Sequence, residues 1–386
     1  MRLAITGSAM VTSVGPDKQT GFDAMCRGVS GRTTLQGFPA QRFNAKYAYE
    51  IADRPAQADG STADATLRAS AWLRDAIVAA VREAKLGPDE DLCVIVGTGL
   101  RELRSLELFW TEGQEFSLPA LHFEAAVEQA LGFAVPVMTV CNACSASNYA
   151  LAMAEDLIAN GRYQCVVVAG CDAITESMFG LLDRVNPEPP EMVQPFERAR
   201  KGVLMGEGAA ALVLENPGNV ARRGARVQAW SRGVGTSCDA NHETAPDMAG
   251  IARAIADAHQ RARLQPRDID LIVVHGTGTH LNDATEANAL RHVFGAAISS
   301  VPISGLKSMT GHTSGSSGLV GVVTAIASLR AQTIAPTLNF SSPMAEAEGM
   351  LIVHDRALQH AMTYVQVNAF GFGGVNAVAI IEKVAA

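Results

Sequence analysis

An internal repeat is the feature that most constrains this chain of 386 residues. Near residue 86 the sequence reads KLGPDEDLCVIVGTG, and near residue 264 it reads RLQPRDIDLIVVHGTG. Each copy holds a helix end, a proline, an acidic turn, a short run of Val and Ile, and then Gly-Thr-Gly. Such runs are typical of strands buried on both faces of a parallel sheet. The repeat therefore predicts two similar α/β halves rather than one irregular core.

The spacing of apolar residues predicts a helix before each of these strands. Leu73, Ile77, Val81 and Ala84 recur at helical spacing, and Gly87-Pro88 should end that helix. The equivalent helix of the second copy should run from Ile251 towards Pro266.

A second correspondence supports the duplication. Cys144 opens CSASNYALAMAEDLIANG, which leads into the strand QCVVVAG, and His312 opens HTSGSSGLVGVVTAIASLRA. Both are turns of small residues that lead into an apolar helix, so Cys144 and His312 are expected at equivalent helix starts. The seam is expected in residues 216–226, NPGNVARRGAR, which gives halves of residues 1–220 and 221–386. A pseudo-twofold axis between the halves would bring both residues to the centre.

Composition narrows the class of protein. Hydrophobic residues make up 48% of the chain and charged residues 18%, which is enough apolar material for a buried core. The formal net charge of −8 gives no reason to expect nucleic acid as a partner. Seven cysteines, an odd number, argue against a disulfide framework and favour the cytoplasm. The opening MRLAITGSAMVTSVG fits a strand and a Gly turn better than a secretory signal, and no apolar run suggests a membrane span.

Cys144 is the candidate nucleophile. It follows the apolar stretch VPVMTV and precedes a helix, where the helix dipole and unpaired N–H groups favour a thiolate. The alternative is a small buried hydrophobe, which a lone cysteine usually is. Cys93 and Cys165, inside Val/Ile runs, fit that alternative. We expect Cys144 to be the only cysteine alkylated rapidly at neutral pH.

Two histidines and a lysine are the other candidates for chemistry. His275 ends the strand LIVVH, and ligands of open α/β sheets collect at the carboxyl ends of strands. His312 and Lys307 lie among small residues in GLKSMTGHTSGSSG. A structural role for either histidine, or a surface position for Lys307, is the alternative. The GFGG turn near the C-terminus lacks the spacing of a dinucleotide-binding loop and should join two strands.

Taken together, these segments resemble the β-ketoacyl-acyl-carrier-protein synthases of the thiolase-fold superfamily, in their elongating Cys-His-His class. The matching segments extend over nearly the whole chain: AITGSAMVTSVG, NACSAS, QPFERARKGVLMGEGAAALVLE, HGTGTHLNDATE, KSMTGHTSGSSG and NAFGFGGVNA. The resemblance implies an α/β thiolase-like fold with duplicated halves in α-β-α-β-α layers. It also implies decarboxylative condensation of a Cys-bound acyl group with malonyl-acyl-carrier protein, in fatty-acid or polyketide-type biosynthesis.

The resemblance implies a role for each matching residue. Cys144 would be acylated from a carrier-protein or coenzyme A thioester. His275 and His312 would assist loss of carbon dioxide and stabilise the enolate. Lys307, with Glu286, would orient the histidine site. The backbone N–H groups of Cys144 and Phe372 would form the oxyanion hole, the Phe372 loop would gate the pocket, and Thr277 and Thr279 would bind the phosphopantetheine arm. No metal and no resident cofactor are implied.

Several positions depart from the family pattern, namely Asn142, Val203, Asn282 and Val375. The Leu100–Val140 span also looks short, and Leu182 falls near the expected floor of the acyl pocket. We therefore leave the acyl chain open. Two alternatives remain: an acyltransferase of this fold that never condenses, and a non-catalytic subunit of a ketosynthase heterodimer. Both histidines, Lys307 and the cysteine itself favour condensation. The expected partners are an acyl carrier protein and a second ketosynthase subunit, in a homodimer or heterodimer paired through the strand QCVVVAG.

Overall fold

The computed structural model describes residues 2–54, 63–186 and 188–385. Eleven strands form one sheet in the order β12-β10-β9-β14-β15-β8-β1-β7-β6-β4-β5. The strands of the first half are β1 (Leu3–Thr12), β4 (Leu92–Gly97), β5 (Val137–Val140), β6 (Cys165–Asp172) and β7 (Gly208–Glu215). Those of the second are β8 (Ala229–Cys238), β9 (Leu271–Val273), β10 (Pro302–Ser304), β12 (Leu351–Ile352), β14 (Tyr364–Gly371) and β15 (Val375–Lys383).

The two halves of the sheet repeat one pairing pattern. In the first half β5, β4 and β6 are parallel, and β7 and β1 follow antiparallel. In the second half β10, β9 and β14 are parallel, and β15 and β8 follow antiparallel. The equivalent strands β1 and β8 pair with each other at the centre, where Leu3 lies opposite Ser231. The predicted duplication is therefore visible strand by strand.

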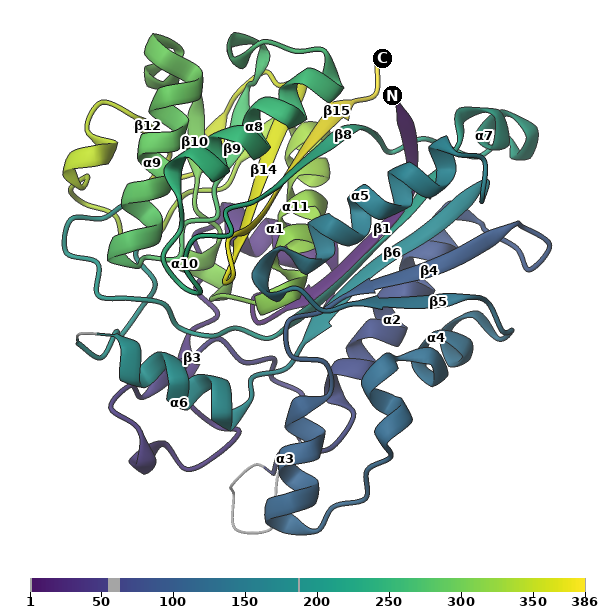
Figure 1. The fold of residues 1–386 in the computed structure, drawn as a ribbon, viewed down its shortest axis with the longest axis horizontal. Helices are drawn as coiled ribbons and strands as arrows, with labels where there is room; N and C mark the ends of the chain where they lie inside the picture. The colour runs from purple at the N-terminus through teal and green to yellow at the C-terminus, as the bar shows by residue number, and fades with distance from the viewer. Residues whose placement is uncertain (1, 55–62, 187, 386) are drawn as a thin grey trace.

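Helices and the two halves of the sheet alternate in five layers (Figure 1). The outer layer of the first half holds α2 (Arg68–Ala84) and α4 (Glu124–Leu131), and that of the second holds α8 (Met248–Ala262) and α9 (His280–Phe294). Between the two halves lie α1 (Lys18–Cys26), α5 (Ala146–Ala159) and α11 (Ser317–Ala331). The remaining helices are α3 (Leu103–Glu112), α6 (Glu176–Val185), α7 (Pro217–Arg223) and α10 (Lys307–Thr310), and the short strands are β2 (Thr33–Thr34), β3 (Tyr47–Ala48), β11 (Thr333–Ile334) and β13 (Leu358–Gln359).

The two helices predicted before the repeated strands are present as α2 and α8. Leu73 and Ile77 are fully buried on the inner face of α2. Both helices end before the expected Gly or Pro, because the next residue adopts the left-handed conformation: Lys85 has a φ of 51° and Arg263 a φ of 57°. Glycine is the usual residue in this left-handed position after a helix, and neither helix has one there. Pro88 and Pro266 therefore lie a few residues beyond the true helix ends.

One organisational prediction needs correction. The strand QCVVVAG, expected to be an exposed pairing edge, is β6, and it lies between β4 and β7 inside the sheet. The free edges of the large sheet are β5 and β12. The segment expected as the seam, residues 216–226, lies between β7 and β8 and contains α7, whose N-cap Asn216 accepts a hydrogen bond from the backbone N–H of Gly218.

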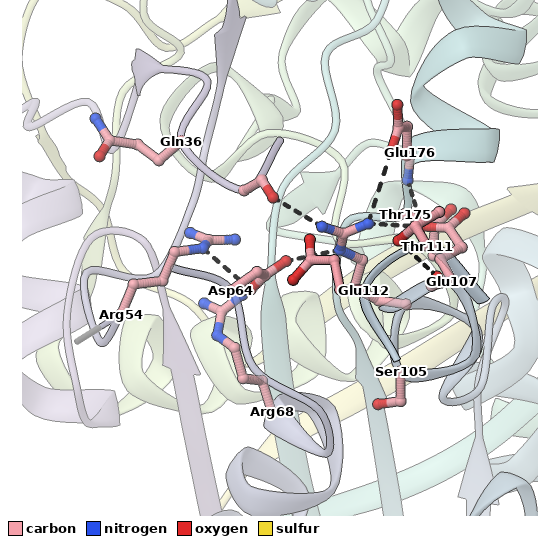
Figure 2. Close-up of polar contacts among 12 residues, drawn as sticks. Gln36, Arg54, Asp64, Arg68, Ser105, Glu107, Thr111, Glu112, Thr175 and Glu176 are labelled. Carbon is pink, nitrogen blue, oxygen red and sulfur yellow. Dashed lines mark hydrogen bonds and ion pairs between the residues drawn. The ribbon is translucent and has the colours of Figure 1, made fainter. Parts of the chain in front are cut away.

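A buried cluster of ion pairs fastens α2 and α3 to the segment that follows β3. The Asp64 carboxylate accepts hydrogen bonds from Arg54 (3.1 Å), Arg68 (2.9 Å) and Arg104 (2.7 Å). Figure 2 shows Asp64 between the Arg54 and Arg68 side chains. Glu207, just before β7, accepts from two of these arginines, Arg54 and Arg68. Through Arg104 the cluster also ties the Leu100–Val140 span to this side of the first half.

Within the described residues, no helix combines the length and apolar character that crossing a lipid bilayer requires.

Candidate active site

Cys144 lies in a strained turn between β5 and α5. The turn is a short 3-10 helix, Ala143–Ser145, and Ala143 has a φ of 57°, which residues with a Cβ seldom adopt. The hairpin between β14 and β15 packs directly against it: a Cβ added to Gly371 would lie 3.2 Å from the Cys144 nitrogen. The turn thus places the Cys144 sulfur beside the backbone of the following hairpin.

Burial and the neighbouring groups have opposite effects on the pKa of the Cys144 thiol. Burial raises the pKa of its thiol to about 11, while the Lys307 charge and the backbone N–H groups of Phe372 and Cys144 itself lower it. Burial is the largest effect, so the resting residue is a thiol and not the thiolate expected from the helix start. Both N–H groups favour negative charge at this sulfur, so they are the donors available to the oxygen of a carbonyl bound there.

The histidine of the second repeat, His275, lies two residues after the end of β9 and is held by its backbone. The N–H groups of His275 and Gly276 donate to the Glu286 carboxylate at 2.8 and 2.9 Å. The Lys307 ammonium donates to the carbonyl oxygen of His275 and lies 3.3 Å from the His275 Nδ1. Three elements, β9, α9 and α10, therefore fix this ring.

His312 faces His275 from the other side of the site. Their ring centroids are 5.3 Å apart, with an angle of 85° between the ring planes. The backbone of His312 is anchored to the segment KGVLMGEG: its N–H donates to the Leu204 carbonyl, and its carbonyl accepts from the Gly206 N–H, both at 2.9 Å. The His312 Nδ1 is buried and has no hydrogen-bond partner among the described residues.

The expected equivalence of the two helix starts holds for the turns but not residue for residue. Ala143 and Ser314 each begin a 3-10 turn with a positive φ, and α5 and α11 follow at the same offset. In that register His312 corresponds to Cys141, and Cys144 corresponds to Gly315. Both reactive residues belong to one repeated turn, at positions three residues apart.

Burial also sets the charge of the histidine site. Burial and the Lys307 charge hold the pKa values of His275 and His312 well below the ordinary value, so both rings are neutral at neutral pH. Burial lowers the pKa of Lys307, while the charges of Glu286, Cys144 and Asp283 raise it. A protonated Lys307 can only donate, so the neighbouring Nδ1 of His275 must accept and its ring proton lies on Nε2.

Glu286, expected to orient the histidine site together with Lys307, contacts the backbone of that site. Its carboxylate accepts hydrogen bonds from the two backbone N–H groups of the His275 turn and from the Asn368 amide (2.9 Å). Its effect on Lys307 is through charge. Burial raises the pKa of Glu286, and the three donors lower it.

The expected phosphopantetheine-binding and gating residues lie at the edge of the site. The Thr277 and Thr279 hydroxyls are 2.9 Å apart, and Thr279 also caps α9 by accepting from the Asn282 N–H. Phe372 lies at the tip of the β14–β15 hairpin with 41% of its surface exposed.

The structure shows the contacts and burial of the four residues that depart from the family pattern. Asn282 donates to the neighbouring Asp283 carboxylate at 3.1 Å, and Val375 begins β15. The Asn142 side-chain oxygen is buried without a hydrogen-bond partner within the described part of the chain. Val203 is buried in one apolar cluster with Leu182. That cluster also contains Leu204, the residue that binds the His312 backbone.

Sequence reasoning missed two groups that build the site. Asp172, at the end of β6, accepts from the Thr98 hydroxyl and from the N–H groups of Gly99, Leu100 and Gly315, so it joins the turn after β4 to the turn that follows His312. Burial raises its pKa to about 7. Asn368 was read only as part of a motif. The signal for both was a polar residue in an otherwise apolar strand.

Grouped metal ligands are absent from the described residues: no three His, Cys, Asp or Glu side chains come together in a way that would hold an ion.

The family model "Beta-ketoacyl synthase, N-terminal domain" matches residues 1–217, and "Beta-ketoacyl synthase, C-terminal domain" matches residues 228–341. A relative from Staphylococcus aureus (strain MRSA252), 3-oxoacyl-[acyl-carrier-protein] synthase 2, is 28% identical over 99% of this chain and 98% of its own length.

Two solved structures have the same fold. The ishigamide ketosynthase/chain length factor is 30% identical, with a TM-score of 0.88 over 100% of this chain and 99% of that one. A type II PKS ketosynthase, solved in complex with its acyl-carrier protein, is 22% identical with a TM-score of 0.86, again over 100% and 99% of the two chains.

Proposed function

Since this chain belongs to the β-ketoacyl synthase family, we propose that Cys144 takes up an acyl group and joins it to a malonyl unit that loses carbon dioxide. The chain is an acyl-transferring, condensing enzyme by its family. The roles of individual residues are proposals. They rest on one observation above all: the Cys144 sulfur, two backbone N–H groups, two neutral histidines and a buried lysine share one site.

The first half-reaction transfers the acyl group. The Cys144 sulfur attacks the thioester carbonyl, a new carbon–sulfur bond forms, and the bond to the carrier thiol breaks. The proton of the Cys144 thiol leaves with that carrier thiol. The N–H groups of Cys144 and Phe372 stabilise the oxyanion that forms on the way, and this type of donor is worth about 10²–10³ in rate.

The second half-reaction makes the carbon–carbon bond. Carbon dioxide leaves the malonyl thioester, and the electron pair of the broken bond forms an enolate. N–H groups of the neutral His275 and His312 oppose the charge on the enolate oxygen. The enolate carbon then attacks the acyl carbonyl on Cys144, and the sulfur leaves and regains a proton. The products are a 3-oxoacyl thioester and a free Cys144.

Two other functions are less well supported. A plain acyltransferase needs no second histidine facing the first, and no lysine buried beside it. A non-catalytic subunit needs no cysteine at the strained turn. This chain has all of these groups. The site therefore favours condensation over both alternatives.

We propose an acyl carrier protein as the donor of both thioesters and a second ketosynthase chain as partner. Support comes from the related ketosynthase solved with its carrier protein. Seven cysteines without a disulfide among them support a reducing cytoplasm. Nothing in the proposed chemistry calls for a resident metal or cofactor.

Mass spectrometry of the intact protein tests this function and its substrate. Incubation with acyl and malonyl carrier proteins, and in parallel with the coenzyme A esters, should add an acyl group that peptide mapping finds on Cys144. Malonyl-carrier protein should then release carbon dioxide and yield a 3-oxoacyl product. Loading without any product would support the plain acyltransferase instead, and no loading at all would contradict the proposal.

The histidine roles have their own test. His275→Ala and His312→Ala should leave loading of Cys144 largely intact and lower carbon dioxide release by on the order of 10²-fold or more, because only the enolate needs the two ring donors. His292→Ala, an exposed histidine on α9, is the matched control. Parental turnover in both site variants would show that the roles are wrongly assigned.

A further inference from the structure

Two buried amides interrupt an apolar layer behind the site. Gln366 and Asn368 lie two residues apart on β14, so both side chains point to the same face of the sheet. Only 0% and 3% of their surfaces are exposed. Their neighbours on that face, such as Ile272 and Val378, are apolar and packed under α8 and α9. A buried amide costs free energy unless it is hydrogen-bonded, which calls for an account of this pair.

The two amides belong to a continuous hydrogen-bonded chain. The His259 Nε2, on the last turn of α8, lies 2.7 Å from the Gln366 side-chain oxygen. The Gln366 amide nitrogen donates to the Asn368 oxygen at 2.8 Å, and the Asn368 nitrogen donates to Glu286 at 2.9 Å. The hydrogen-bonded chain thus runs from α8, along the face of β14 that α8 and α9 cover, to the α9 carboxylate that holds the His275 turn.

The direction of every bond in this chain is fixed from its Glu286 end. An ionised carboxylate only accepts, so Asn368 must present its NH₂ to Glu286 and its oxygen to Gln366. Gln366 must then present its own NH₂ to Asn368 and its oxygen to His259. His259 is left as the donor through Nε2–H. Its Nδ1 is buried without a partner among the described residues, and burial lowers the pKa of the ring, in agreement with one proton.

The other end of the chain acts on the catalytic site through charge. The negative charge of Glu286 supports the positive charge of Lys307. Protonated Lys307 forces the adjacent His275 Nδ1 to accept, which leaves the His275 proton on Nε2 (3.3 Å between the nitrogens). If Asn368 turned over, its oxygen would face Glu286, and the carboxylate would lose a donor and take up a proton more readily.

We propose that Gln366 and His259 are positioning residues, which lock the orientation of Asn368 and thereby hold His275 in its Nε2–H tautomer. The inference deepens the proposed function, because the N–H of His275 is the donor assigned to the enolate. It stands on the three hydrogen bonds and their forced direction. The tautomer itself is a property of the resting protein and can be measured without any turnover.

The test is nitrogen-15 NMR of histidine-labelled protein, with the His275 signal assigned by its loss in His275→Ala. The parent should show His275 as the single Nε2–H tautomer at neutral pH. Gln366→Met keeps the length and bulk of the side chain and removes both amide atoms. It should give a mixture of tautomers, and the pH at which the single tautomer is lost should move down, since Lys307 then loses its charge more readily. The charged or titratable groups that face Lys307 are Cys144, His275, Asp283, Glu286 and His312.

A second pair of variants separates positioning from packing. His259→Phe removes the donor and keeps an aromatic ring beside Phe294, whose centroid lies 5.4 Å from that of His259. His259→Gln keeps an N–H donor. We expect His259→Phe to give mixed tautomers and to slow carbon dioxide release by on the order of 10- to 100-fold with acyl loading unchanged, and His259→Gln to restore both.

The outcomes distinguish this inference from the proposed function. A single parental tautomer in Gln366→Met and His259→Phe would overturn the inference, even if the parent condenses as proposed. Failure of the parent to release carbon dioxide from malonyl-carrier protein would overturn the function, while the tautomer readout still decides the inference. If Gln366→Met does not fold, as judged by circular dichroism, the His259 pair alone gives the decision.

Discussion

Cys144 and Lys307 change each other's proton affinity. The Lys307 charge lowers the pKa of the thiol, and a Cys144 thiolate would raise the pKa of Lys307. Acylation ends this mutual effect, because a thioester cannot ionise. In the loaded enzyme the pKa of Lys307 is then set by burial, which lowers it, and by the charges of Glu286 and Asp283, which raise it.

This coupling predicts the alkaline side of the pH profile. Burial lowers the pKa of Lys307, so carbon dioxide release should fall as the pH rises through that lowered value and the charge is lost. Lys307→Arg keeps its charge throughout this range and should remove the alkaline fall, at a lower rate because the fork of the guanidinium fits poorly. Carbon dioxide release from pH 6 to 10 measures both. An identical alkaline fall in the arginine variant would assign it to another group.

The cysteines need a different test from the one the sequence suggested. Cys144 was expected to be the only cysteine to react rapidly, but Cys141 and Cys238 are exposed, and burial raises the pKa of Cys144. We expect brief alkylation to label Cys141 and Cys238 as well, while prior acyl loading protects Cys144 alone. Peptide mapping with and without loading checks this. Protection of Cys93 or Cys171 in place of Cys144 would contradict the assigned nucleophile.

The hairpin of β14 and β15 is the element that brings the second N–H to the sulfur. Gly371 lies against the Cys144 turn, where an added Cβ would be 2.9 Å from Val375 and 3.2 Å from the Cys144 nitrogen. Gly371→Ala should push the hairpin away and slow acyl loading by about 10²-fold, the usual cost of one lost oxyanion donor.

Gly373→Ala is the matched control for that prediction. An added Cβ there meets no atom within 4 Å, so the substitution adds only the strain of a φ of +83°, roughly 1–2 kcal/mol of stability. Loading rates and thermal unfolding of both variants separate the two effects. Equal loading defects in the two variants would mean that general hairpin strain, and not contact with Cys144, controls the rate.

The elements that sequence could predict are those with a repeated pattern. Strands and helices were predicted correctly around the two copies at Leu86 and Leu264 and around the turns of Cys144 and His312. The spacing of apolar residues, and the Gly and Pro residues that end an element, are local features of the sequence. The order of strands in the sheet depends on residues far apart in the sequence. β6 is an interior strand because it pairs with β4 and β7, and nothing within QCVVVAG indicates these two partners. Gln366 and Asn368 were missed because their partners outside β14, His259 and Glu286, lie on the helices α8 and α9 and far away in the sequence.

At the scale of the whole molecule, the sheet leaves one substantial free edge in the first half. β5 pairs with β4 on one side only, and all four of its residues are partly exposed. Exposed strand edges are usually covered in natural proteins. A twofold partner that adds its own β5 would cover both edges at once and extend the sheet across two chains.

This arrangement predicts a dimer whose contact includes β5. Light scattering should give twice the mass of the chain, 40.6 kDa for one copy. Hydrogen exchange of residues 137–140 should be slow at high protein concentration and faster on dilution below the dissociation constant. Residues 351–352 at the other edge, in β12, serve as the internal control and should not respond. A fully active monomer, or protection of β5 that is independent of concentration, would rule this pairing out.

The repeated turn also bears on how such a site arises. Both copies of the turn belong to one chain, so the two copies can carry different side chains. One copy has a thiol at position 144 where the other has Gly315, and one has an imidazole at position 312 where the other has Cys141. The nucleophile and a proposed enolate donor thus come from two copies of the same turn, each specialised for one task.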